Sequence, residues 1–125
     1  MAKRQIKTDE SAPPGGPYSQ AIVSGDLVFL AGQTPNTPAG DKVEGSFEEE
    51  ARQVFENLAA VAKAAGGSLD QAVRVGVYIR DTANFPAMNA VYEEYFNEPR
   101  PARTTIQSDL PGFSIEVDAI LSLGD

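Results

Sequence analysis

The middle of the chain carries sequence signals for both the start and the end of a helix. Ser46 and Glu49 have the spacing of a capping box, in which each side chain bonds the backbone N–H of the other residue. Gly66 then marks the C-terminal end, because glycine commonly follows the last helical turn. Between these signals, apolar residues recur every three or four positions at Ala51, Val54, Phe55, Leu58, Val61, Ala62 and Ala65. The spacing predicts a helix that packs on a core.

Strand patterns flank this helix on both sides. Val73, Val75 and Val77 alternate with polar or small residues, which is the period-two pattern of a strand. Gly25-Asp26 is a two-residue connection that suits a hairpin between two further strands. The predicted elements are strands at 20–24, 27–32, 72–80, 101–106 and 113–119, an additional leading strand around 5–8, and helices at 46–65 and 84–96. The order after the leading strand is ββαβαββ.

Two helices in such an order would cover only one face of the sheet. Several predicted strands carry apolar residues on both sides, so the second face also needs burial. The pattern therefore predicts a homo-oligomer.

Composition excludes several kinds of chemistry. The 125 residues fit one domain and contain neither cysteine nor histidine, which excludes disulfides, thiolate nucleophiles, Cys/His zinc sites and imidazole bases. Ten basic and eighteen acidic residues leave a formal charge of −8, which disfavours nucleic acid and anionic membrane surfaces as partners. The basic start of the chain lacks the apolar stretch of a signal peptide or membrane anchor. A soluble, cytoplasmic protein is expected.

Arg103 and Glu116 are the first candidates for a site, because they stand on two predicted strands joined by a short turn. If these strands are neighbours, both side chains can reach one cleft. Arginine can bind a small carboxylate through two parallel hydrogen bonds, and glutamate can accept a proton from water. The alternative is a structural ion pair across the strands.

Five short motifs occur in order along almost the whole chain. They are Gly16-Pro17-Tyr18-Ser19-Gln20-Ala21, Ala31-Gly32-Gln33-Thr34-Pro35, Asn89-Ala90-Val91-Tyr92, Pro101-Ala102-Arg103 and Ile115-Glu116-Val117-Asp118-Ala119. Together they resemble the Rid (YjgF/YER057c/UK114) family of reactive intermediate imine deaminases.

The resemblance implies an α+β fold like that of Bacillus-type chorismate mutase, in one domain spanning residues 1–125. This fold has a mixed six-stranded sheet with two helices on one face, and it assembles as a homotrimer with active sites between subunits. The implied activity is hydrolysis of 2-imino acids, which arise from enamines such as 2-aminoacrylate, to 2-oxo acids and ammonia. No cofactor or metal is implied.

The resemblance also assigns roles to three residues. Arg103 would hold the substrate carboxylate, and Glu116 would orient or deprotonate the attacking water. A carboxylate ionised beside Arg103 would be a weak base, which favours orientation of the water. Tyr18 would stand at the mouth of the site, although it could instead anchor the Pro/Gly-rich loop before it.

Further matched positions are weaker candidates. Gly32 would let the substrate approach the backbone, and Asn89 would bond either the site or only its own helix surface. Thr105 replaces a cysteine of many relatives, and its backbone would contact the substrate. Ala31 replaces a serine, which could alter substrate preference. Asp118 should point the same way as Glu116, with either a site role or a structural one.

Other functions stay open at this point. The replacements at Ala31 and Thr105 are compatible with a non-catalytic module that binds a small carboxylate or another enzyme. A specialised deaminase for a larger imine is a further alternative. Ribonuclease activity, associated with some relatives, is disfavoured by the acidic charge and the lack of histidine.

Overall fold

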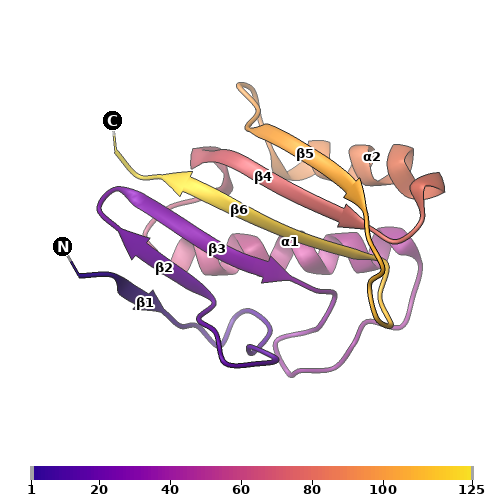
Figure 1. Ribbon diagram of the computed structural model, residues 1–125, viewed down its shortest axis with the longest axis horizontal. Helices are drawn as coiled ribbons and strands as arrows, with labels where there is room; N and C mark the ends of the chain where they lie inside the picture. The colour runs from indigo at the N-terminus through magenta and orange to yellow at the C-terminus, as the bar shows by residue number, and fades with distance from the viewer. Residues whose placement is uncertain (1, 125) are drawn as a thin grey trace.

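The computed structural model describes residues 2–124, which form one six-stranded sheet with two α-helices packed on it (Figure 1). The strands are β1 (Arg4–Ile6), β2 (Ala21–Ser24), β3 (Leu27–Gln33), β4 (Ala72–Ile79), β5 (Ala102–Gln107) and β6 (Ile115–Ser122). The helices are α1 (Phe47–Ala64) and α2 (Phe85–Tyr95), with short 3₁₀ turns at η1 (Leu69–Gln71) and η2 (Thr82–Asn84). The predicted α+β fold is confirmed.

The order of the strands across the sheet is β1-β2-β3-β6-β4-β5. Neighbouring strands are antiparallel except β4 and β5, which are parallel because α2 carries the chain back across the sheet between them. The sheet is therefore mixed, as expected. The assumption that the strands bearing Arg103 and Glu116 are neighbours is wrong, because β4 lies between β5 and β6.

Both helices cover the same face of the sheet, behind the strands in Figure 1. The capping box at the start of α1 is present, since Ser46 Oγ accepts from the N–H of Glu49 and the Glu49 carboxylate accepts from the N–H of Ser46. Helix α1 packs mainly on β6 and β3, and its Phe55 and Leu58 are fully buried in the same core cluster as Val117 and Leu121 of β6. The apolar face predicted for this helix thus forms the core.

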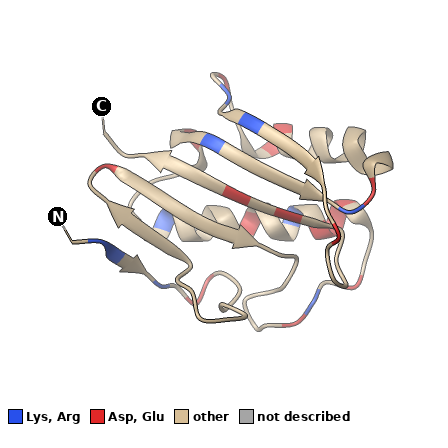
Figure 2. Ribbon diagram, in the orientation of Figure 1, with Lys and Arg blue, Asp and Glu red and all other residues tan. Residues whose placement is uncertain are grey.

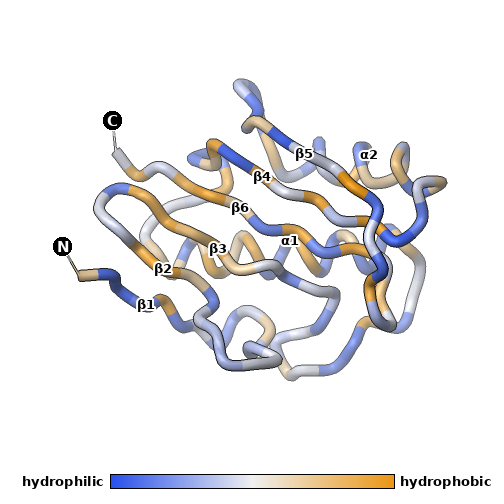
Figure 3. Tube along the Cα trace, in the orientation of Figure 1, coloured by the Kyte–Doolittle hydropathy of each residue, from blue (hydrophilic) through white to orange (hydrophobic). Residues whose placement is uncertain are grey.

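The other face of the sheet, which we call the open face, has no helix over it in the described part of the chain. It nevertheless carries large apolar side chains: Leu27 is 40 % exposed, Phe29 43 % and Ile106 49 %. Figure 3 shows that apolar stretches run along several of these strands. Across residues 2–124, no helix combines the length and apolar character needed to cross a membrane.

Candidate functional site

The predicted site residues fall into two groups on opposite faces of the sheet. Residues paired across neighbouring strands point to the same face of a sheet. Val75 of β4 belongs to the core under the helices and is paired with Arg103 of β5 and Ala119 of β6, so Arg103 points to the helix-covered face. Tyr78 of β4 is paired with Glu116, which points to the open face. Figure 2 shows the basic positions of β4 and β5 and the two acidic positions of β6. Arg103 and Glu116 of one chain therefore share no cleft and form no ion pair, contrary to both sequence-based alternatives.

The first group surrounds Arg103 at the β5 edge of the sheet. The guanidinium carbon lies 4.7 Å from the ring centre of Tyr92 and 5.8 Å from that of Phe85, both on α2. Its Nη1 atom is 3.9 Å from the sulfur of Met88. Asn89 lies on the same side of α2, because it is four residues after Phe85 and three before Tyr92. The helix holds the arginine through its aromatic rings, while no carboxylate within residues 2–124 forms an ion pair with it.

Two buried hydroxyl groups accompany Arg103. Thr105 follows it by two residues and therefore shares its face of β5, and the Thr105 Oγ1 atom has no hydrogen-bond partner among the described residues. The hydroxyl of Tyr92 is likewise buried without a partner in this part of the chain. Burial raises the pKa of Tyr92, against a lowering by Arg103 and Arg100, so the phenol stays a neutral donor. These groups can bind an anionic ligand together with the guanidinium.

The second group forms a hollow of about 360 Å³ on the open face, which we call the glutamate hollow. Its walls are Tyr18, Ala31, Gly32, Thr34 and Glu116. The pairing of β3 with β6 is shifted between Leu30 and Gln33, so Ala31 and Gly32 occupy a β-bulge opposite β6. The hollow is large enough for a small organic acid.

Gly32 is needed because Glu116 lies against its backbone. A Cβ atom at position 32 would clash with the Glu116 carboxylate and would lie 3.1 Å from its Cδ atom. The backbone of Gly32 itself has no unusual φ, so the requirement is one of space. The sequence predicts that a substrate approaches the backbone at Gly32, and this stays a prediction. Within the chain, the group that lies against Gly32 is the Glu116 carboxylate.

Tyr18 stands at the rim and is 51 % exposed. The backbone N–H of Gly15 donates to its hydroxyl oxygen over 3.0 Å, and the ring lies beside Gly16. The Pro/Gly-rich loop is thus folded back on Tyr18. Because the hydroxyl acts only as an acceptor there, its own proton is free for a ligand in the hollow.

The electrostatic surroundings of Glu116 favour its protonated form. Burial raises the pKa of Glu116, and the negative charge of Asp118 raises it further. A carboxylate with a raised pKa is a stronger base than an ordinary surface glutamate. The expectation that an Arg103 guanidinium weakens Glu116 as a base concerns a site between copies and stays a prediction.

The sequence analysis missed Tyr78 as a member of this surface. Its hydroxyl donates to Asp118 Oδ2 over 3.1 Å. The only sequence signal was the position of Tyr78 on the polar side of the alternating strand, which does not reveal a partner forty residues away. Asp118 does share the face of Glu116, as predicted.

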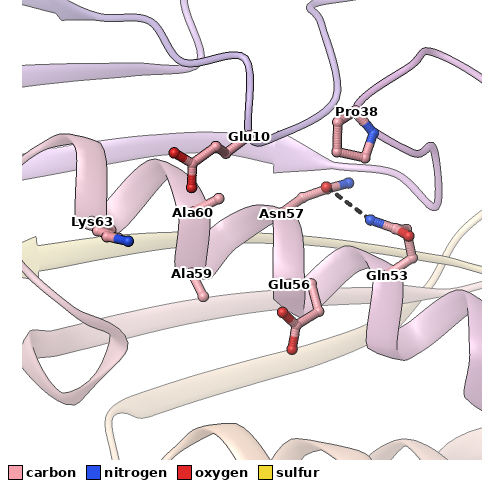
Figure 4. Close-up of a pocket in the computed structure, with 8 residues that line it drawn as sticks. All are labelled: Glu10, Pro38, Gln53, Glu56, Asn57, Ala59, Ala60 and Lys63. Atoms are coloured by element: carbon pink, nitrogen blue, oxygen red, sulfur yellow. Dashed lines mark hydrogen bonds between the residues drawn. The ribbon is translucent and has the colours of Figure 1, made fainter.

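A larger hollow of about 490 Å³ lies beside α1, and Figure 4 shows the side chains around it. It contains none of the predicted site residues. Its most buried polar side chain is Asn57, whose Nδ2 atom donates to Asn36 O over 2.8 Å and to Thr34 O over 3.4 Å while its Oδ1 atom accepts from Gln53 over 3.0 Å. That amide holds the loop after β3 on the helix and leaves no donor for a ligand. Chemistry thus favours the smaller glutamate hollow, and within residues 2–124 no acidic cluster is arranged to hold a metal ion.

The chain is similar to known proteins along nearly its whole length. The sequence profile of the family described as Endoribonuclease L-PSP matches residues 9–122. A RutC family protein of Pyrococcus abyssi is 46 % identical over 123 residues, covering 96 % of this chain and 97 % of the relative. The 2-iminobutanoate/2-iminopropanoate deaminase of Dermatophagoides farinae is 39 % identical over 122 residues, with 95 % of each chain covered.

A solved structure supports the same assignment. The crystal structure of E. coli TdcF with bound serine superimposes with a TM-score of 0.88 at 29 % identity, covering 95 % of this chain and 98 % of TdcF. The two folds thus agree along nearly the full length of both chains. The chain belongs to the Rid family, also described as the YjgF, RutC or L-PSP family.

Proposed function

We propose that this protein hydrolyses 2-imino acids to 2-oxo acids and ammonia without a cofactor. The glutamate hollow of one copy and the Arg103 group of a second copy form the site together, in a homotrimer. The family membership, the deaminase name of one relative and the serine bound to TdcF support this assignment. The observation that carries it is the half-buried Glu116 carboxylate, which has a raised pKa and faces a hollow sized for a small acid.

In the proposed reaction, Arg103 binds the substrate carboxylate with two parallel hydrogen bonds. The oxygen of a water molecule bonds to the protonated imine carbon, and one proton of that water passes to Glu116. Glu116 then returns its proton to the amino nitrogen of the tetrahedral intermediate. As the C=O bond forms and the C–N bond breaks, the hydroxyl oxygen gives its remaining proton to Glu116. The released ammonia takes up that proton and leaves as ammonium, so a 2-oxo acid and an ionised Glu116 remain.

A second copy is required because Arg103 and Glu116 of one chain point to opposite faces of the sheet. The exposed apolar side chains of the open face support self-association, since such patches usually mark contact surfaces. Arg103 lies on the edge strand β5, from which it can reach beyond its own chain. Conversion of Phe29, a central residue of that face, to Asp is expected to give monomers in sedimentation experiments.

The proposal is tested by producing 2-iminopropionate and a bulkier imino acid with an amino-acid oxidase and trapping the unreacted imine with semicarbazide. Wild type should lower the trapped signal. Glu116→Gln should lose about 10²- to 10⁴-fold in rate if Glu116 transfers the proton. Arg103→Ala should weaken transition-state binding by about 2–5 kcal/mol. Arg52→Ala, which removes an exposed arginine paired with Glu94, is the matched control and should act as wild type.

Failure of wild type to accelerate hydrolysis of either imino acid would overturn the proposed activity. If the protein then still bound small carboxylates in calorimetric titrations, and Arg103→Ala did not, the non-catalytic binding module would take its place. The replacement of serine and cysteine by Ala31 and Thr105 is the feature that makes this second outcome worth measuring.

A further inference from the structure

Tyr78 lies opposite one acidic residue of β6 on the open face and bonds the next one. It is directly opposite Glu116 in the pairing of β4 with β6, yet its hydroxyl reaches the next acidic position and donates to Asp118 over 3.1 Å. Gly76 makes this possible, because it is the residue opposite Asp118. A Cβ atom at position 76 would lie 2.6 Å from Asp118 Oδ1 and 3.1 Å from the Tyr78 hydroxyl. The missing side chain thus leaves the space in which the two groups meet.

The charges around Glu116 are few. On its own strand only Asp118 shares the face, and on β4 the groups facing it are Tyr78 and Arg74. The Nη1 atom of Arg74 bonds the carbonyl oxygen of Val75 over 2.6 Å. The part of β3 that lines the hollow carries no ionisable side chain, and the loop before β2 contributes the phenol of Tyr18. Within one chain, Asp118 is therefore the charged group that most directly affects Glu116. In the assembled site, the guanidinium of Arg103 from a second copy also faces Glu116, and it is the same in wild type and in a variant at position 118.

We propose that Asp118, oriented by Tyr78 above Gly76, is a positioning residue that keeps Glu116 able to take a proton from the attacking water. The inference rests on the proposed deaminase function. Two electrostatic effects agree with this placement of Asp118. Its negative charge is the largest cause of the raised pKa of Tyr78, and it adds to the effect of burial in raising the pKa of Glu116. The same fixed charge thus keeps the phenol a donor and the glutamate a stronger base.

The decisive variant is Asp118→Asn, because asparagine keeps the shape and can still accept from Tyr78 but carries no charge. Two titrations are followed by ¹³C NMR in the assembled protein without substrate: the Glu116 carboxyl carbon and the phenol carbon of Tyr78. Both pKa values should fall in the variant. Asp26→Asn removes an equal charge from the β2–β3 turn and should leave both titrations unchanged.

Activity gives the second readout. The acid side of the pH profile of kcat/KM should move to lower pH in Asp118→Asn, with a several-fold loss of kcat where Glu116 is ionised, because the weaker base accepts a proton less readily. A variant that altered only folding would lower the amplitude of the profile without moving it.

The outcomes separate this inference from the proposed function. An unchanged Glu116 titration in Asp118→Asn overturns the role of Asp118, whether or not wild type is active. A pH profile that stays in place despite a shifted titration also overturns it. A shifted titration in a protein that hydrolyses no imino acid overturns the proposed function, while it supports the coupling between the two carboxylates.

Discussion

Mixed assemblies of two inactive variants can decide whether the site lies within a chain or between chains. Arg103→Ala keeps the glutamate hollow, and Glu116→Gln keeps the arginine group. Each variant alone should be nearly inactive under the proposed mechanism. Because the two residues of one chain point to opposite faces of the sheet, we expect activity to return when the variants assemble together.

The expected magnitude follows from counting sites in a symmetric assembly. A working site needs Arg103 from a Glu116→Gln copy and Glu116 from an Arg103→Ala copy. Every trimer that holds both variants has one such site among its three, so the isolated mixed trimers should show about one third of wild-type activity. A site built within one chain would gain nothing from mixing. Wild type mixed equally with the double variant gives the complementary test: in the isolated mixed trimers about one sixth of the sites would work if they lie between chains, and about one half if they lie within chains.

The assay is imine hydrolysis, measured by semicarbazide trapping on co-expressed chains carrying two different affinity tags. Sequential purification on both tags isolates the mixed assemblies, and the separately purified variants give the baseline. Mixed assemblies no more active than that baseline would refute the inference of a site between copies. One half of the activity in the mixture of wild type with the double variant would refute it independently.

Two further predictions concern the glutamate hollow. Because the pKa of Glu116 is raised in the folded protein, the native state binds this proton more tightly than the unfolded chain, and the free energy of unfolding falls as pH rises through that interval. We therefore expect Glu116→Gln to be more stable than wild type in urea at near-neutral pH and to lose this advantage in acid; equal or lower stability at neutral pH would contradict the raised pKa. Gly32→Ala should retain the fold, because the backbone there has no positive φ, but should displace the Glu116 carboxylate and lower kcat by about 10²-fold, measured beside the circular dichroism spectrum. Unchanged kcat would show that the carboxylate does not need its observed position.

Much of the local structure could be predicted because its causes are local. The capping box at Ser46 and the apolar spacing of α1 depend on residues within a few positions of one another. The strands were likewise evident from alternation, although the leading strand lies at Arg4–Ile6 instead of around 5–8. The matched family motifs identified Tyr18, Gly32 and Glu116, which the structure brings together, and Arg103, which it places elsewhere.

The sequence by itself determined the kinds of elements, the faces that each one buries and the chemistry available to a chain without histidine or cysteine. Only the tertiary structure decided that β6 lies between β3 and β4, which separates Arg103 from Glu116 and sets Glu116 beside Gly32. The physical reason is the range of the forces involved. Helix and strand periods arise between near neighbours, whereas strand order and the Tyr78–Asp118 hydrogen bond depend on how distant segments bury one core together.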